Sequence, residues 1–160
     1  MAPRRLLLIR HAQAGNAPLD RDRPLTGHGT GQARAIGAWL AERELVPGRV
    51  LVSPARRAAQ TWAAAAAALA GATEPTVDPR IYDNTFDGVL AAIRETPDGV
   101  GCLAVVGHNP SIGALAHELA DGSFGSGFPT GGVAVLELPG TYAELGPGTA
   151  RLSAVHLPDR

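Results

Sequence analysis

Three short segments of the chain carry side chains that could do chemistry on an anion. They are Arg10-His11, Ser53-Pro54 with Arg57 close behind, and His108-Asn109-Pro110. A guanidinium is a planar, permanently charged fork that suits phosphate oxygens, and a neutral imidazole beside arginines can act as a nucleophile. If the fold brings these segments together, they form a site for a multiply charged anion, and phosphate is the natural candidate.

Each segment follows a short apolar run, and each run predicts a buried strand that ends where the polar residues begin. The predicted strands of this kind are 6–9, 49–52 and 102–107. Further strands are expected at 76–81, 133–138 and 151–157, the last two as an antiparallel pair. Helices are expected at 31–45, from Ser53-Pro54 to about Leu69, around Val89, Leu90 and Ile93, and from His108-Asn109-Pro110 to Asp121-Gly122.

Strands that alternate with helices predict one α/β domain over residues 1–160, with three layers (α/β/α) and a mainly parallel central sheet. Such sheets bind ligands beyond the carboxyl ends of their strands. Ser53 is a good helix N-cap with Pro54 at the first helical position, and Asn109-Pro110 repeats the pattern. Two helix N-termini would then add unpaired N–H groups to the anion site.

Two histidines in one pocket also raise the question of a metal ion. Metal sites usually add Asp, Glu or Cys ligands at defined spacing, and none accompanies His11 or His108. Two arginines would repel a cation beside them. These residues therefore favour a site without a metal.

Composition restricts the other classes of function. With 45% hydrophobic and 18% charged residues the chain is of the globular class, and its net charge of −1 gives no general attraction to nucleic acid or to an anionic membrane. No signal peptide and no apolar stretch of about 20 residues is apparent. The single Cys102 cannot form an intramolecular disulfide, so we expect a buried thiol and a cytoplasmic location.

Two stretches are expected to be loops. The polar stretch 12–30, with the charge run Asp20-Arg21-Asp22-Arg23, is either functional or a solvated surface loop. The stretch 122–132 is rich in Gly and Ser and is expected to be mobile in part; whether it closes over a substrate is left open. Three further histidines match no pattern and are interpreted as structural or surface residues: His28, His117 and His156.

Several motifs resemble those of the histidine phosphatase superfamily, which has the phosphoglycerate-mutase-like fold. They are Arg10-His11-Ala12, Arg23-Pro24-Leu25-Thr26 with Gly29, Val52-Ser53-Pro54 with Arg57-Ala58 and Gln60-Thr61, Val106-Gly107-His108-Asn109-Pro110, and Phe128-Pro129-Thr130-Gly131. They span nearly the whole chain in the family's order. The short length, the alanine after His11 and the Arg-Pro-Leu-Thr segment look most like the SixA-type phosphohistidine phosphatase branch.

The resemblance implies a role for each matching residue. His11 would attack phosphorus in line and carry a transient phosphoryl group, and water would then release phosphate. Arg10, Arg57 and His108 would hold the phosphoryl oxygens. Arg57 rather than Arg56 matches the family, because it is the arginine followed by Ala-x-Gln-Thr. The resemblance implies no metal and no organic cofactor, and it assigns substrate binding to Arg23, Asn109 and Thr130.

Larger members of the family carry a Glu proton donor in an insertion that this chain lacks. Asp83 and Asp87 lie in roughly the corresponding region. Asp83 could be the general acid, and a helix-capping or turn role is the alternative for both residues. A missing acid suits cleavage of a P–N bond, because an imidazole leaving group needs less help than an alkoxide.

The sequence therefore predicts a phosphatase that acts on protein phosphohistidine. One alternative is a phosphatase of a small phosphoester or nucleotide, and another, of a different class, is a phosphate-binding module without catalysis. The expected partner is accordingly a phosphorylated protein or a small phosphorylated metabolite.

Overall fold

The computed structural model describes residues 2–122, 124–125 and 127–158. Its elements are β1 (Arg4–Arg10), the 3-10 turn η1 (Asp20–Asp22), α1 (Gly27–Glu42), β2 (Arg49–Val52), α2 (Arg56–Ala66), β3 (Thr76–Val77), α3 (Pro79–Asp83), α4 (Phe86–Arg94), β4 (Cys102–Gly107), α5 (Ser111–Leu119), β5 (Val133–Leu138), the 3-10 turn η2 (Tyr142–Glu144) and β6 (Arg151–His156).

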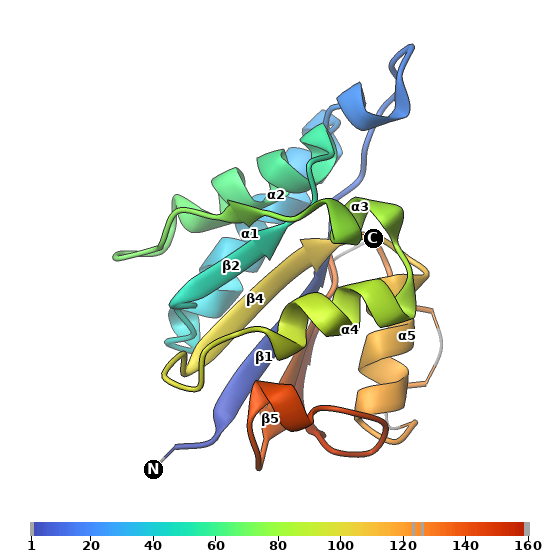
Figure 1. Cartoon of the computed structure of the whole chain (residues 1–160). Coiled ribbons are helices and arrows are strands. Elements are labelled where there is room, and N and C mark those ends of the chain that lie inside the picture. Colours follow the sequence, from blue (N-terminus) through green and yellow to red (C-terminus); the bar gives the residue numbers. More distant parts are fainter. Residues whose placement is uncertain (1, 123, 126, 159–160) are drawn as a thin grey trace.

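A mixed sheet of six strands forms the middle of the molecule, in the order β3-β2-β4-β1-β5-β6 (Figure 1). β1, β2, β3 and β4 run parallel, β5 is antiparallel to β1, and β6 is antiparallel to β5. The predicted α/β fold with a mainly parallel sheet is confirmed, and so is the antiparallel closing pair. The register aligns the carboxyl ends of β1 and β4, because Arg10 pairs with Gly107.

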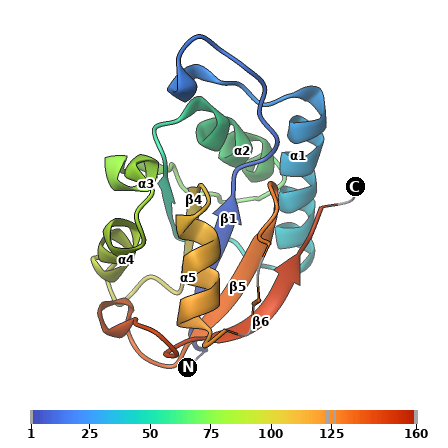
Figure 2. The ribbon, with the colours of Figure 1, turned by 90° about the vertical axis from the view of Figure 1, so that its right-hand side faces the viewer.

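Alternate residues of β1 point to opposite faces of the sheet and build two cores. Leu6 and Leu8 belong to the core under α3, α4 and α5, while Leu7 and Ile9 belong to the core under α1 and α2 (Figure 2). All four side chains are fully buried. From Leu6 to Ile9 the strand is therefore apolar on both faces, and Arg10 and His11 follow directly.

The close contact between α1 and α2 fixes the position of α2. A Cβ atom on Gly37 of α1 would lie only 2.2 Å from the carbonyl oxygen of Ala65 in α2, so this contact requires glycine. Arg57, in the first turn of α2, is thereby held against the sheet edge.

Two predicted elements have wrong boundaries. The helix expected at 31–45 is α1, which starts at Gly27 because Thr26 caps it: the Thr26 hydroxyl oxygen accepts from the backbone N–H of Gly29 at 2.9 Å. The strand expected at 76–81 covers only Thr76–Val77. It stops there because the Asp78 carboxylate accepts from the backbone N–H of Arg80 at 3.0 Å and so begins α3.

The two predicted N-caps are also wrong. The helix expected from Ser53-Pro54 to about Leu69 is α2, Arg56–Ala66, and Ala55 holds its N-cap position. At α5 the N-cap position belongs to Pro110, and Asn109 stands just before it. The Asn109 side-chain oxygen still accepts from the backbone N–H of Gly113 at 3.1 Å, so it supports the first turn from one residue further out.

The stretch 12–30 rises above the carboxyl ends of the strands (Figure 2). A β-bridge between Ala14 and Leu25 ties its two arms together.

In the stretch 122–132, residues 123 and 126 lie outside the described residues, and the expected mobility of this stretch stays a prediction. No helix in the described part of the chain combines the length and the apolar character needed to cross a membrane.

Candidate active site

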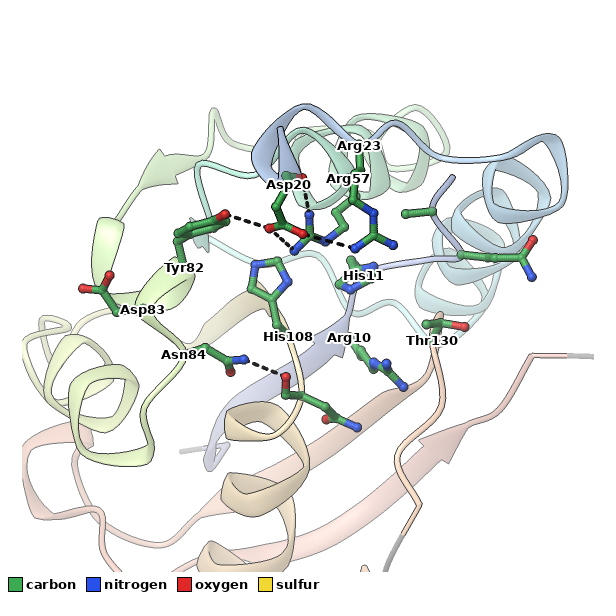
Figure 3. Close-up of a pocket in the computed structure, with 13 residues that line it drawn as sticks. Arg10, His11, Asp20, Arg23, Arg57, Tyr82, Asp83, Asn84, His108 and Thr130 are labelled. Atoms are coloured by element: carbon green, nitrogen blue, oxygen red, sulfur yellow. Dashed lines mark hydrogen bonds and ion pairs between the residues drawn. The ribbon is translucent and has the colours of Figure 1, made fainter. Parts of the chain in front are cut away.

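A pocket of about 570 Å³ opens where the carboxyl ends of the strands meet the stretch 12–30 and α3 (Figure 3). It is lined by Arg10, His11, Gln13, Ala14, Asp20, Arg23, Arg57, Tyr82, Asp83, Asn84, His108, Asn109 and Thr130. The structure thus brings every residue of the predicted site to one cavity. Arg56, the arginine that was set aside, is exposed and does not line it.

His11 follows β1 directly, and its ring is almost completely buried, with 8% of the residue exposed. Ring atom Nδ1 lies 2.8 Å from the carbonyl oxygen of Ala12. Because a carbonyl oxygen only accepts, we assign the ring proton to Nδ1. Nε2 then keeps its lone pair, and it has no hydrogen-bond partner among the described residues.

His108 lies beside His11 in the pocket, with 5.1 Å between the ring centroids. Its Nε2 atom lies 2.8 Å from the hydroxyl oxygen of Ser53, which also accepts from the backbone N–H of Ala55 at 3.2 Å. The hydroxyl hydrogen has no other acceptor among the described residues, so we assign it to Nε2 of His108. The ring proton of His108 is then on Nδ1, where it can serve as a donor.

Both histidines are neutral near pH 7. Burial lowers the pKa of His11 to about 4; the hydrogen bond to Ala12 opposes this shift, and the charges of Arg57, Arg10 and Arg23 add to it. Burial also lowers the pKa of His108 to about 3, helped by His11 and Arg57. A neutral His11 is the form that can attack an electrophile.

Arg10 and Arg57 place two guanidinium groups beside these rings. Arg57 is buried, whereas Arg10 is half-buried and donates from Nη1 to the carbonyl oxygen of Phe128 at 3.0 Å. Arg10 Nε, Arg57 Nε and His108 Nδ1 are buried and have no hydrogen-bond partner within the described chain. Arg10, Arg57 and His108 all line the pocket, so the donor capacity that they do not use within the protein can serve the oxygens of an anion there.

Asp20 is the main residue that the sequence did not single out for the site. Its carboxylate accepts from the Tyr82 hydroxyl at 2.7 Å, from Arg57 Nη2 at 3.2 Å and from Arg23 Nη1 at 3.2 Å, and its carbonyl oxygen accepts from Arg57 Nη1 at 2.9 Å (Figure 3). The bonds to Tyr82, Arg23 and Arg57 lower the pKa of Asp20 to about 2. The only signal in the sequence was its place in a charge run of a long loop.

The three predicted substrate-binding residues line the pocket, but their side chains differ in how many hydrogen bonds they already make within the protein. Arg23 is held by Asp20 and by the carbonyl oxygen of Gly15. Asn109 uses both ends of its side chain within the protein, donating to the carbonyl oxygen of Phe128 and accepting from Gly113. Thr130 has no side-chain hydrogen bond with the described residues, so its hydroxyl is free to meet a ligand.

Asp83 and Asp87 do not cap helices. Asp83 is the last residue of α3 and lines the pocket with an exposed carboxylate that has no hydrogen bond with the described residues. Asp87 lies in the first turn of α4, whose N-cap is Thr85. The capping interpretation is wrong, because Asn84 ends α3 in a left-handed conformation and Thr85 begins α4.

Asn84 is a further residue that the sequence analysis missed. Its amide donates to the carbonyl oxygen of Asn109 at 2.6 Å, and its oxygen accepts from the backbone N–H and the hydroxyl of Ser111. Asn84 therefore ties α3 to the segment that carries His108. Its only signal in the sequence is the turn-forming composition of Tyr82-Asp83-Asn84-Thr85, and such residues specify local structure alone.

The other histidines and the cysteine lie away from the pocket. His28 and His117 are exposed, and the His156 ring packs on Trp39 with 5.4 Å between centroids. Cys102 is half-buried rather than fully buried, and burial raises the pKa of its thiol to about 11. Within the described residues, no group of three or more His, Cys, Asp or Glu is placed to hold a metal ion.

Comparisons with known proteins agree with this geometry. Residues 6–89 match the model of the histidine phosphatase superfamily (branch 1). The chain is 32% identical to phosphohistidine phosphatase SixA of Escherichia coli over 147 residues, which cover 90% of this chain and 89% of that protein.

Two solved structures extend the similarity to the fold. A proposed phosphohistidine phosphatase SixA from Nakamurella multipartitia is 34% identical, has a TM-score of 0.88, and is matched over 99% of this chain and 98% of that one. A protein histidine phosphatase SixA complexed with tungstate is 28% identical, has a TM-score of 0.81, and is matched over 94% and 95% of the two chains. The fold is thus the phosphoglycerate-mutase-like fold of these phosphatases.

Proposed function

The chain belongs to the histidine phosphatase superfamily, and from this premise we propose that it dephosphorylates protein phosphohistidine through a phosphoryl group carried on His11. The observation that carries the proposal is the state of the His11 ring. Its Nδ1 donates a hydrogen bond to the Ala12 carbonyl, which leaves a free lone pair on Nε2 of a residue that lines the pocket.

In the first step, His11 Nε2 attacks phosphorus in line and the bond from phosphorus to the leaving group breaks. The developing imidazolium is stabilised by the Ala12 carbonyl, which accepts from Nδ1 at 2.8 Å. Arg10, Arg57 and the Nδ1–H of His108 hold the phosphoryl oxygens, whose negative charge their donors match.

In the second step, water attacks the phosphoryl group on His11. The P–N bond to His11 breaks, phosphate leaves with the protons of water, and the neutral imidazole is restored. The same three donors stabilise both transition states, because the phosphoryl oxygens do not change place between the steps. Neither step needs a metal ion or an organic cofactor.

The ionised carboxylate of Asp20 at the entrance favours a leaving group that requires no proton. Asp20 is ionised at neutral pH, since its pKa is about 2, and so it cannot act as a general acid there. An imidazole leaving group departs without such help. The 32% identity to E. coli phosphohistidine phosphatase SixA supports the same substrate class, and we propose a cytoplasmic location for this activity.

A side-by-side dephosphorylation screen tests the proposal. We expect protein phosphohistidine to give the highest kcat/KM among phosphohistidine proteins, sugar phosphates and nucleotides, with no loss of activity in a chelator. Faster turnover of a sugar phosphate or nucleotide would contradict protein phosphohistidine as the substrate and assign the activity to a small phosphoester. Phosphate binding without any turnover would make the protein a binding module, and restoration of chelator-treated activity by a divalent ion would contradict the metal-free mechanism.

A further inference from the structure

We propose that Asp20 is the residue that recognises the leaving group: its carboxylate accepts the ring N–H of a protonated phosphoimidazole while the P–N bond breaks. The inference rests on the proposed function and adds to it a determinant of substrate choice. It assigns to Asp20 a specificity role at the entrance of the pocket, apart from the phosphoryl-holding groups at its inner end.

The position of Asp20 fits this role. It lines the same pocket as His11, and 52% of its side chain is exposed, so a bound substrate can reach it. In-line attack by His11 Nε2 places the leaving group on the side of phosphorus opposite to His11. Figure 3 shows Asp20 near the ends of Arg57, Arg23 and Tyr82, at the side of the cavity formed by the stretch 12–30 and α3.

The Asp20 carboxylate has room for one more donor. Two ionised oxygens offer about four acceptor sites in total. Oδ2 accepts from Tyr82 and Arg57, whereas Oδ1 accepts only from Arg23 among the described residues. An exposed acceptor position therefore stays available on Oδ1. The existing three bonds hold the carboxylate in a fixed orientation, which reduces the entropy that a substrate contact would otherwise cost.

The chemistry balances without a proton donor. In a phosphoimidazole protonated on its second nitrogen, P–N cleavage returns the bonding electrons to the first nitrogen and leaves a neutral imidazole that keeps its N–H. His11 Nε2 forms the new P–N bond as the old one breaks. Asp20 accepts the N–H bond throughout, so it stabilises the cationic ring that makes the better leaving group.

The same carboxylate disfavours ordinary phosphate esters. An alkoxide requires a proton as it leaves, and Asp20 stays ionised at neutral pH because Tyr82, Arg23 and Arg57 bond to it. The leaving group of an ester also carries no positive charge that the Asp20 carboxylate could stabilise. Asp83, the other carboxylate of the pocket, has no such fixed bonds, so it lacks the orientation that recognition requires.

The charges of the pocket permit an anionic phosphoryl group beside Asp20. Three guanidinium groups, those of Arg10, Arg23 and Arg57, line the cavity with the two carboxylates of Asp20 and Asp83. Two of the three guanidiniums bond directly to Asp20. The carboxylate is thus screened from the phosphoryl oxygens and remains able to attract a cation at the entrance.

Substrate preference measured in the full-length protein tests the inference. Wild type, Asp20→Asn and the control Asp22→Asn are assayed with N-phosphoimidazole and with p-nitrophenyl phosphate, whose leaving group needs no proton. Asparagine keeps one oxygen that can accept from Tyr82 and Arg57, but it loses the charge and the second oxygen, which accepts from Arg23. We expect the Asp20→Asn loss of kcat/KM on N-phosphoimidazole to exceed its loss on p-nitrophenyl phosphate by about 10-fold or more, as for a charge-assisted hydrogen bond.

Asp22 lies in the same 3-10 turn, is exposed and does not line the pocket, so Asp22→Asn should leave both activities near wild type. A second variant, Asp20→Glu, keeps the charge and should keep a substrate ratio closer to wild type than Asp20→Asn does. Equal losses of Asp20→Asn on both substrates, or no loss, would overturn the inference. Wild type that hydrolyses neither N-phosphoimidazole nor protein phosphohistidine would instead overturn the proposed function.

Discussion

The inner wall and the entrance of the pocket differ in how they are built. The inner wall consists of His11, Arg57 and His108, with Ser53 bonded to His108 behind it, and none of these residues is more than 8% exposed. The entrance consists of Asp20, Arg23, Tyr82 and Asp83, and the side chains of Asp20 and Arg23 are 52% and 34% exposed. A rigid buried wall suits chemistry common to all substrates, whereas an exposed polar entrance suits selection between them.

The largest effect is expected at the inner wall. Arg57→Ala should lower kcat/KM by about 100- to 1,000-fold on every substrate, because it removes donors from the phosphoryl oxygens in the transition state. Arg57→Lys should recover only part of the loss, since lysine lacks the planar fork. The adjacent, exposed Arg56→Ala is the matched control and should have little effect. If Arg57→Ala lowered kcat/KM only on phosphohistidine substrates, the inner wall would also select substrates, and the proposed difference between wall and entrance would be wrong.

Because the inner wall buries two neutral histidines, the stability of the folded protein should fall at acidic pH. In the unfolded chain each takes up a proton near pH 6.5, but in the folded protein only near pH 4 for His11 and pH 3 for His108. The unfolded state therefore binds more protons below pH 6.5, and the free energy of unfolding falls as pH decreases. By pH 5 the loss is about 2 kcal/mol for each histidine.

Denaturant unfolding at pH 7.5 and pH 5 in phosphate-free buffer measures this loss. His108→Asn should remove roughly half of the combined effect, because it leaves only the His11 contribution. The exposed His28→Asn serves as a control that keeps the wild-type pH dependence. An unchanged loss in His108→Asn would show that the acid sensitivity arises elsewhere.

Ser53→Ala is expected to have a smaller effect, about 10-fold on kcat/KM for all substrates, since one orienting hydrogen bond is lost. The Ser53 hydroxyl positions His108 and fixes its proton on Nδ1. Nitrogen NMR of the His108 ring should therefore report a change of tautomer in the variant. Ser153→Ala, on the exposed face of β6, is the control. Full activity with an unchanged tautomer would refute the positioning role.

The smallest effect is expected at the entrance, from Tyr82→Phe. The change removes the 2.7 Å bond to Asp20 but leaves the two arginine bonds. We expect about a 3-fold loss of kcat/KM on N-phosphoimidazole, with a smaller loss on p-nitrophenyl phosphate, because the carboxylate loses one of three anchors. Equal losses of kcat/KM on the two substrates would show that Tyr82 supports the chemistry common to all substrates and does not contribute to substrate choice.

The inner wall was largely predictable because its residues follow strands with strong local signals. The apolar runs before His11 and His108 gave the strand ends, and parallel strands bring such ends to one edge. Ser53 marks the limit of this reasoning. Its N-cap role was inferred from neighbouring residues, but its partner His108 lies 55 positions away in the chain.

The entrance was not predictable from local pattern. Asp20 meets Arg57 across 37 positions and Tyr82 across 62 positions, and no periodicity or capping signal specifies such pairs. In the sequence Asp20 is one of four alternating charges, which are usually solvated. Only the path of the stretch 12–30 over the sheet edge places this carboxylate beside the phosphoryl-holding arginine. That the chain forms a single domain over 1–160 stays a prediction.

The most direct test of the account is to trap the phosphoryl group on the protein. The chain is exposed briefly to a labelled phosphohistidine protein or N-phosphoimidazole, denatured in mild base, and the acid-labile label is located by peptide mapping. We expect label on the peptide that contains His11, and none above background in His11→Ala. Label on His108, or equal labelling of wild type and His11→Ala, would contradict the assignment of His11 as the nucleophile.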